Sequence, residues 1–508
     1  MSDATYRDQL VPRYAGNPLI EALPDILSAK DAARSLAYYP PCDSKTRQLP
    51  PEVRTHLVMN ALNFFEPLPV HIDLEQRISR VIRAGYANRN PTAVDQWQDL
   101  DQRIGSIRAP GGIPLRSPDT TGFSIIGIPG IGKTKAVERI LQLSPQVIRH
   151  KEYQGVPFIR SQLVSLKLTC PHDGSIKGLS LDFFREIDAL LGTDHHRDYA
   201  GGGRRTVDEL IPAMARVAWI HCLGLLVIDE IQHLNQAKSG GAERMLNFFL
   251  QMTNALGVPI LLIGTYAALP VLNRELRQIR RCSGQGDLIW DHMANDAVWR
   301  HFIESLWNHQ HTKTLVPLNQ ELSDTLYDEC VGIVDFGVKM FALAQIRAID
   351  SGSEKITAAI IRSVARDSFR LAQPALRALR SGDMSAMAGM TDLHSIDFAS
   401  AAHELRKNHL LQELSRGSTI VSDLAKPPAE QPSAESPAEQ QVSQAAPSSP
   451  TVLPPKPRKN LAPKSKSECL LVNVAEAGIA KGASAHQALS EAQLIKPLFD
   501  PPLSHAAG

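Results

Sequence analysis

The sequence predicts an α/β protein with a parallel sheet covered by helices on both faces, followed by an all-helical subdomain. Three observations lead to this fold class. The glycine-rich loop GIPGIGKT, Gly127–Thr134, follows an apolar run and opens a helical segment. Short apolar runs alternate with helical segments from Phe123 to Ile263, a pattern typical of parallel sheets. From Ala294 onward the apolar residues recur only at helical spacing.

Composition sets the broad class. The chain has 508 residues, which suggests two to four domains at about 100–200 residues each. With 43% hydrophobic residues and a net charge of +1, it can bury a large core and has no global attraction to nucleic acid or membrane. The six cysteines are far apart, which favours neither a zinc site nor a disulfide framework. The polar N-terminus lacks an apolar signal region, and Ala255–Leu272 is interrupted by prolines. We therefore expect a reduced, cytoplasmic protein with no membrane segment.

Residues 1–105 are predicted to form a mostly helical N-terminal extension that binds a partner. Helical periodicity is found over Val53–Phe65 and Leu74–Ala84. Residues 106–120 are rich in Gly and Pro, which indicates a loop at the start of the next domain.

Residues 106–293 are predicted to form the nucleotide-binding α/β core. The expected strands are Phe123–Ile126, Leu163–Leu168, Leu225–Ile228 and Pro259–Ile263. The expected helices are Lys135–Leu143, Leu181–Leu191, Val207–His221 and Glu243–Leu256, with a loop over Asp194–Arg205.

Residues 294–385 are predicted to form a helical lid. Its expected helices are Val298–His309, Gln320–Glu329, Val338–Ile349 and Ile356–Phe369. Beyond it we expect a helical extension over residues 386–425, a disordered linker rich in Pro, Ala and Ser over 426–467, and a C-terminal partner-binding segment over 468–508.

The strongest chemical signal is the loop Gly127–Thr134, which matches G-x-x-x-x-G-K-[ST]. Its glycines allow the backbone to wrap around phosphates with several N–H groups pointing inward. Lys133 supplies a positive charge for the β- and γ-phosphates, and the Thr134 hydroxyl can ligate Mg²⁺. The nucleotide-binding residues expected here are Gly127, Ile128, Pro129, Gly130, Ile131, Gly132, Lys133, Thr134 and Lys135.

The second signal is the acidic pair that ends the apolar run LLVIDE, Leu225–Glu230. Burying carboxylates at the end of a strand costs free energy unless the charges interact with a partner such as a ligand or metal ion. We expect Asp229 to hold Mg²⁺ together with Thr134, and Glu230 to orient and deprotonate the water that attacks ATP. The alternative is an acidic pair that stabilises a helix N-terminus.

Weaker signals concern residues that would complete the catalytic site. Thr265 follows the expected strand Pro259–Ile263 and is predicted to sense the γ-phosphate. One of Arg274, Arg277, Arg280 and Arg281 is a candidate arginine finger that reaches a neighbouring subunit. Lys339, early in a lid helix, is a candidate phosphate sensor. The alternative, an ordinary surface lysine, is more common at such positions.

DNA contacts are harder to place. The candidates are Lys167, Lys177, Arg204 and Arg205, each of which could equally be an ordinary surface charge. The basic run Pro454–Lys466 in the tail could be a weak phosphate-binding tether or a solubilising linker.

Four stretches together resemble the TnsC-type AAA+ ATPases, the TniB-related regulators of Tn-seven-like bacterial transposons. They are GYANRNP (Gly85–Pro91), CPHDGSIKGLSLDFF (Cys170–Phe184), Leu225–Thr265 and RRCSGQG (Arg280–Gly286). The resemblance covers roughly residues 5–385. It implies the AAA+ form of the P-loop fold, with ATP and Mg²⁺ as cofactors.

The resemblance also implies function and partners. Such proteins assemble on double-stranded DNA as homo-oligomeric rings or filaments, and link a target-selection protein of the TnsD or TniQ type to transposase subunits of the TnsA and TnsB type. ATP hydrolysis then acts as a switch. By the same analogy, Tyr86, Arg89 and Asn90 would lie near the adenine or ribose, and the segment after the linker would bind the TnsA-type partner.

Two other functions remain open. A replication initiator or helicase loader would use the same ATP site. A signalling NTPase of the STAND type would use it without DNA, but such proteins usually carry long repeat arrays, and the sequence shows none.

Overall fold

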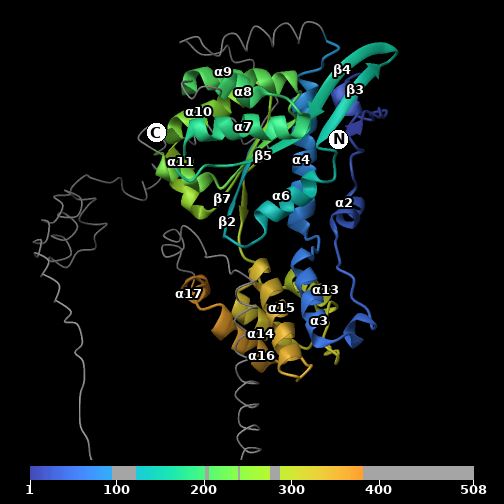
Figure 1. Ribbon diagram of the computed structural model, residues 1–508, viewed down its shortest axis with the longest axis vertical. Helices are drawn as coiled ribbons and strands as arrows, with labels where there is room; N and C mark the ends of the chain where they lie inside the picture. The colour runs from blue at the N-terminus through green and yellow to red at the C-terminus, as the bar shows by residue number, and fades with distance from the viewer. Residues whose placement is uncertain (94–121, 201–204, 238–240, 275–285, 382–508) are drawn as a thin grey trace, which may run out of the picture. The chain divides into compact units, whose positions relative to one another are not determined.

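The computed structural model describes residues 1–93, 122–200, 205–237, 241–274 and 286–381 (Figure 1). The predicted loop at 106–120 and the three segments predicted beyond residue 385 lie outside these ranges.

The core of the fold is a five-stranded parallel sheet. Its spatial order is β5 (Ser165–Thr169), β6 (Leu225–Asp229), β7 (Ile260–Gly264), β2 (Phe123–Gly127) and β8 (Leu288–Trp290). Every residue of β2, β6 and β7 is buried, as expected for central strands covered on both faces. The four predicted strands are confirmed, and the short edge strand β8 is an addition.

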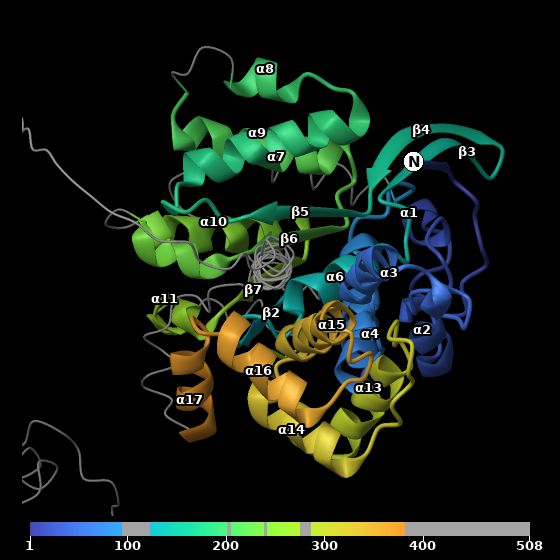
Figure 2. The ribbon, with the colours of Figure 1, turned by 60° about the horizontal axis from the view of Figure 1, so that its bottom comes forward.

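Helices cover the two faces because strand residues alternate between them. In β6, Leu226 and Ile228 pack into one core cluster, and Leu225 and Val227 pack into another. The first cluster is covered by α7 (Ile176–Leu191), α9 (Val207–Ile220) and α10 (Gly241–Leu256). The second is covered by α1 (Pro18–Glu21), α2 (Ala29–Leu36), α4 (Pro69–Ala87) and α6 (Lys133–Leu141), on the opposite side of the sheet (Figure 2). The predicted fold class, a P-loop α/β sheet between two layers of helices, is confirmed.

A β-hairpin stands in the long interval between the P-loop helix and the sheet strand β5. It consists of β3 (Val147–Tyr153) and β4 (Val156–Leu163), and the short strand β1 (Ser2–Asp3) pairs with β3. The tight turn is made by Gln154 and Gly155, both at positive φ, as two-residue hairpins require. The sequence does not predict this hairpin.

A short helix, α8 (His195–Ala200), lies within the predicted loop Asp194–Arg205. The Asp188 carboxylate accepts hydrogen bonds from the backbone N–H groups of His195 and His196. These bonds satisfy donors that a helix start leaves open, so the loop prediction is wrong over these six residues.

The all-helical subdomain is present as predicted. It contains α13 (Ala297–Trp307), α14 (Gln320–Cys330), α15 (Val334–Asp350), α16 (Ala358–Ser368) and α17 (Gln373–Ser381). Four short helical segments occur earlier in the chain. The 3₁₀ turn η1 (Thr46–Gln48) precedes the core, η3 (Ile231–Gln236) follows β6, and η4 (Tyr266–Ala268) and α11 (Leu269–Arg274) follow β7.

The N-terminal residues pack against both the sheet and the helical subdomain. Helix α3 (Pro51–Val58) and the 3₁₀ turn η2 (Met59–Asn63) join the hydrophobic cluster of the lid helices, and α3 lies beside α15 (Figure 1). Helix α4 then packs beneath the sheet. The buried Arg54 side chain pairs with Glu354 at 2.6 Å. In the described part of the chain, residues of the N-terminal extension therefore pack into both cores, and their role in binding a partner stays a prediction.

Among the described residues, none of the helices is both long and apolar enough to span a bilayer. Cys42, Cys170, Cys222 and Cys330 are free thiols.

Candidate nucleotide-binding site

The P-loop connects strand β2 to helix α6. Gly127 must be glycine because a Cβ there would lie 1.9 Å from the backbone carbonyl oxygen of Trp290. Gly132 has a φ of 103°, which side chains rarely tolerate. Helix α6 begins at Lys133, so its N-terminal N–H groups and positive dipole end face the loop. The backbone is therefore shaped for phosphate.

Lys133 is buried at the base of this loop. Its ammonium group donates to the carbonyl oxygens of Gly127 and Ile128, both at 2.9 Å. Burial lowers the pKa of Lys133 to about 8, against the opposing effect of Glu230 and Asp229. A phosphate anion would favour the charged form of such a lysine.

Thr134 and Asp229 meet although they come from different elements. The Thr134 hydroxyl donates to Oδ2 of Asp229 at 2.9 Å, and Asp229 is buried. A hydroxyl and a carboxylate beside a phosphate loop are the oxygen donors that Mg²⁺ prefers, because this ion takes few protein ligands and completes its shell with water and phosphate. These two side chains fit the predicted metal site, and the bound ion would neutralise charge on the β- and γ-phosphates.

Glu230 follows in the left-handed region, with φ 56° and ψ 40°. Such a conformation is unusual for a residue with a side chain and tends to occur at functional sites. The backbone N–H of Glu230 donates to Oδ1 of Asp229 at 2.9 Å. The Glu230 carboxylate accepts a short hydrogen bond from the amide of Gln232.

Thr265 lies at the end of β7, beside these two carboxylates. It is 5% exposed, and its hydroxyl is buried with no partner among the described residues. A buried hydroxyl without a hydrogen bond costs free energy, so a water or phosphate oxygen in the pocket would satisfy it. The sensor role of Thr265 stays a prediction.

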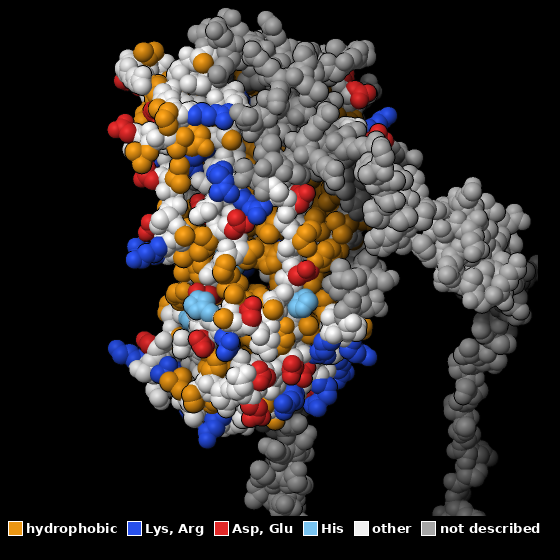
Figure 3. Space-filling view, turned by 180° about the vertical axis from the view of Figure 1, so that it is seen from behind, with side chains coloured by type: hydrophobic (Ala, Val, Ile, Leu, Met, Phe, Trp, Pro, Cys, Tyr) orange, Lys and Arg blue, Asp and Glu red, His pale blue; other side chains and the backbone are white. Residues whose placement is uncertain are grey.

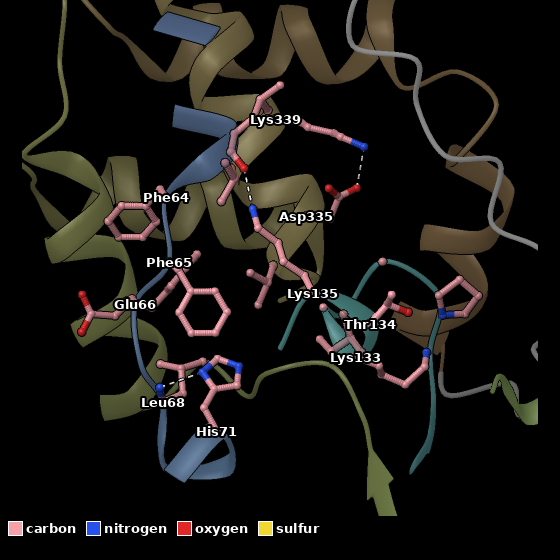
Figure 4. A pocket seen from close by; sticks show the side chains of 18 of the residues that line it. Phe64, Phe65, Glu66, Leu68, His71, Lys133, Thr134, Lys135, Asp335 and Lys339 are labelled. Carbon is pink, nitrogen blue, oxygen red and sulfur yellow. Dashed lines mark hydrogen bonds and ion pairs between the residues drawn. The ribbon is translucent and has the colours of Figure 1, made fainter. Parts of the chain in front are cut away.

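One pocket of about 610 Å³ is lined by Lys133, Thr134, Asp229, Glu230 and Thr265, and its volume is within the range of small-molecule sites. Figure 4 shows its two ends. Lys133 and Lys339 lie toward one end, and aromatic and apolar side chains toward the other, where the Lys135 ammonium group donates to the Leu62 carbonyl at 2.5 Å. Lys339 of α15 pairs with Asp335 at 2.7 Å, and the Asp335 backbone N–H donates to the Gly130 carbonyl at 3.2 Å. The lid therefore contacts the P-loop directly.

The apolar end was missed by the sequence analysis. It is built by the N-terminal segment that crosses from the lid to the sheet, with lid side chains opposite: Leu62, Phe64, Phe65, Glu66, Leu68, His71, Phe302 and Val338. His71 accepts from the Leu68 N–H through Nδ1 at 2.9 Å, and burial lowers its pKa to about 4. This end is therefore largely apolar, with a neutral histidine, and suits a nucleobase. The Phe64–Phe65 pair is an apolar signal, but no motif marks it as a nucleotide contact.

Tyr86, Arg89 and Asn90 do not line this pocket, which corrects their placement beside the adenine. The Tyr86 hydroxyl donates to the Cys222 carbonyl at 2.9 Å, and Arg89 donates to the Leu223 carbonyl at 2.8 Å. Both carbonyls precede β6, whereas the P-loop follows the carboxyl end of β2. Tyr86 and Arg89 therefore lie at the amino ends of the sheet strands, and the Asn90 amide donates to the Gly16 carbonyl.

Lys167 lies in strand β5, within the predicted strand. Its ammonium group contacts Glu138 at 2.5 Å and Asp229 at 3.4 Å. Burial opposes its charge, but these two carboxylates outweigh it and raise the pKa of Lys167. Lys167 therefore faces Asp229 and Glu138, and its candidate role in DNA binding stays a prediction.

The remaining candidates are scattered. Lys177 is the second residue of α7, and exposed Arg205 lies against the Tyr199 ring. Arg204, Arg277, Arg280 and Arg281 lie outside the described residues, and Arg274 ends α11. On the described face in Figure 3, basic and acidic side chains are interspersed.

Comparison with known proteins supports the fold. A family model described as an AAA domain matches residues 120–272, and the chain has the AAA+ P-loop fold. No match to a curated protein sequence is found.

Several solved structures are similar. The Orc1 protein of Aeropyrum pernix, in complex with DNA, is 14% identical with a TM-score of 0.35, covering 55% of this chain and 66% of that one. Cdc6p of Pyrobaculum aerophilum is 16% identical with a TM-score of 0.35, covering 66% and 85%. A Walker-type ATPase of Pyrococcus abyssi is 13% identical with a TM-score of 0.34, covering 62% and 90%. These scores are too low to carry a functional conclusion.

Proposed function

We propose that this chain is an Mg²⁺-dependent ATPase that assembles on duplex DNA and regulates DNA transposition. For the hydrolysis, the observation that carries the proposal is the meeting of Thr134 and Asp229 beside Lys133 in one pocket. Lys133 and Lys339 take the triphosphate, and the aromatic end takes the base. Glu230 then accepts a proton from the attacking water.

The role in transposition rests on the resemblance of four sequence stretches to TnsC-type regulators. ATP binding would stabilise a homo-oligomer on DNA by linkage, with an arginine of the 274–281 region completing the neighbour's site. The assembly would link a target-selection protein to transposase subunits. Hydrolysis would remove the γ-phosphate contacts and release the assembly.

The first experiment measures DNA binding by the purified chain with ATP, with a slowly hydrolysed analogue and with ADP, at fixed salt. We expect nucleotide-dependent assembly on duplex DNA that is lost with ADP. A Glu230→Gln variant should keep ATP binding and assembly but lose hydrolysis, whereas Lys133→Ala should lose ATP binding. Rapid turnover by Glu230→Gln, or tight ATP binding by Lys133→Ala, would contradict the roles of these residues.

A replication initiator or helicase loader would use the same pocket, so the partner decides between the two functions. We expect the DNA-bound, ATP-loaded chain to retain the transposase subunits and not a replicative helicase. Retention of the helicase alone would assign the chain to replication. ATP hydrolysis with no DNA binding in any nucleotide state would point instead to a signalling switch.

A further inference from the structure

The Gln232 side chain connects the end of strand β7 to the carboxylate that follows β6. Gln232 lies in η3 and is 5% exposed. Its Oε1 accepts a hydrogen bond from the backbone N–H of Thr265 at 3.2 Å. Its Nε2 donates a short hydrogen bond to Oε2 of Glu230. One buried amide thus contacts both the predicted sensor residue and the predicted general base.

The orientation of this amide follows from the chemistry of its partners. A backbone N–H can only donate, so the oxygen of Gln232 must face Thr265. The NH₂ group is then directed to Glu230, which as a carboxylate can only accept. A flipped amide would place a donor against a donor and an acceptor against an acceptor. The two contacts therefore specify a single arrangement.

The Glu230 carboxylate needs a side-chain contact to fix its position, because the hydrogen bond of its backbone fixes only the main chain. The hydrogen bond to Oδ1 of Asp229 is donated by the Glu230 backbone N–H and does not involve the Glu230 side chain. Among the described residues, the Gln232 amide is the hydrogen-bond partner found for the Glu230 carboxylate. A glutamate side chain has several rotatable bonds, and losing that freedom is costly, so an unrestrained carboxylate would sample positions away from the pocket.

We propose that Gln232 is a positioning residue for ATP hydrolysis, which fixes the Glu230 carboxylate relative to Thr265. This inference rests on the proposed ATPase function. With the carboxylate held, the attacking water lies between a fixed acceptor and the unpartnered Thr265 hydroxyl. Gln232 acts through Glu230 and does not itself touch the nucleotide, since it is not among the residues that line the pocket.

The test uses the full chain and two substitutions. Gln232→Met keeps the size and loses both polar contacts, and Gln232→Glu keeps an oxygen for the Thr265 N–H but loses the donor to Glu230. We expect kcat for ATP to fall about 10-fold to 100-fold in both variants, with KM within about three-fold of the wild-type value. Gln236→Met, on the exposed side of the same turn, is the matched control and should leave kcat unchanged.

A second measurement separates positioning from a general structural role. In a Glu230→Gln background the base is already absent, so adding Gln232→Met should change the residual rate by less than about two-fold. A further fall in that background, or an unchanged kcat in the single variants, would overturn the inference. A rise in kcat would also overturn it, because the amide would then restrain the base. If Glu230→Gln itself retains wild-type turnover, the proposed role of Glu230 fails, and the inference fails with it.

Discussion

The Thr134 hydroxyl donates a 2.9 Å hydrogen bond to Oδ2 of Asp229, although 95 positions separate the two residues. One stands at the start of α6 and the other at the end of β6. They meet because β2 and β6 are parallel strands of one sheet, each paired with β7, and the carboxyl ends of parallel strands share an edge. A ligand pair for Mg²⁺ is thus preformed by the fold.

Replacing Thr134 by Val should weaken this metal site while keeping the packing. Valine has the shape of threonine but no hydroxyl, so Mg²⁺ loses a ligand. We expect the Mg²⁺ concentration for half-maximal ATP hydrolysis to rise about 10-fold or more. Thr134→Ser keeps the hydroxyl and should behave like the wild type. An unchanged Mg²⁺ requirement in Thr134→Val would contradict the assignment.

Nucleotide affinity should decrease as the pH rises above about 8, where Lys133 loses its proton in the empty site. Phosphate binds the charged form, so binding above this pH requires proton uptake, with up to about ten-fold weaker affinity per pH unit. Titration calorimetry in two buffers of different ionisation enthalpy measures both the affinity and the uptake. A flat affinity from pH 7 to pH 9.5, with no proton uptake, would be the contrary result.

The lowered pKa of Lys133 makes nucleotide affinity fall with rising pH, but it makes the stability of the nucleotide-free chain rise with pH. Burial depresses the pKa of Lys133 from 10.5 to about 8. Between these values the unfolded chain binds more protons than the folded chain, so this group makes the free energy of unfolding increase with pH. A phosphate bound to Lys133 would reduce this contribution, because the folded pKa then rises.

Local patterns in the sequence predicted most of the sheet and the phosphate end of the site. Apolar runs locate β2, β6 and β7, and the glycine spacing locates Lys133. The apolar end of the pocket could not be predicted, because Phe65 reaches the pocket through long-range packing with no periodic signal. The sequence also did not predict which way side chains point. The position of Lys167 in a strand was predicted, but its contact with Asp229 was not.

Lys167 gives a test of this difference. Its ammonium group is engaged by Glu138 and Asp229, so Lys167→Met should leave the salt dependence of DNA binding unchanged. Removing a true phosphate contact lowers the slope of log K against log salt by about one. Arg205→Met tests the exposed candidate in the same titration. A slope lowered by Lys167→Met would support the predicted DNA contact instead.

The buried pair of Arg54 and Glu354 should be essential to the attachment of the N-terminus to the lid. The Arg54 side chain is 0% exposed and also donates to the His311 carbonyl at 3.0 Å. Arg54→Met leaves a carboxylate without its main partner, which should cost about 3–5 kcal/mol in denaturant unfolding. Arg34→Met removes a surface pair with Asp31 and should cost less than about 1 kcal/mol. Equal effects of the two variants would argue against a special role of the Arg54–Glu354 pair.

Asp335 and Lys339 should have opposite effects on ATP affinity, although they form one ion pair of 2.7 Å in the lid. Both line the phosphate end of the pocket, where a carboxylate repels the triphosphate and an ammonium group attracts it. Asp335→Asn removes the repulsion and releases Lys339, so the affinity for ATP should rise by about five-fold or more. Lys339→Met should lower the affinity by a similar factor.

A binding assay with both single variants and the double variant measures these changes in ATP affinity. The affinity of the double variant should lie between those of the single variants, because Asp335 acts partly through Lys339 and partly by itself. If Asp335→Asn instead weakens binding, the carboxylate orients the lysine, and the ion pair belongs to the nucleotide-bound state.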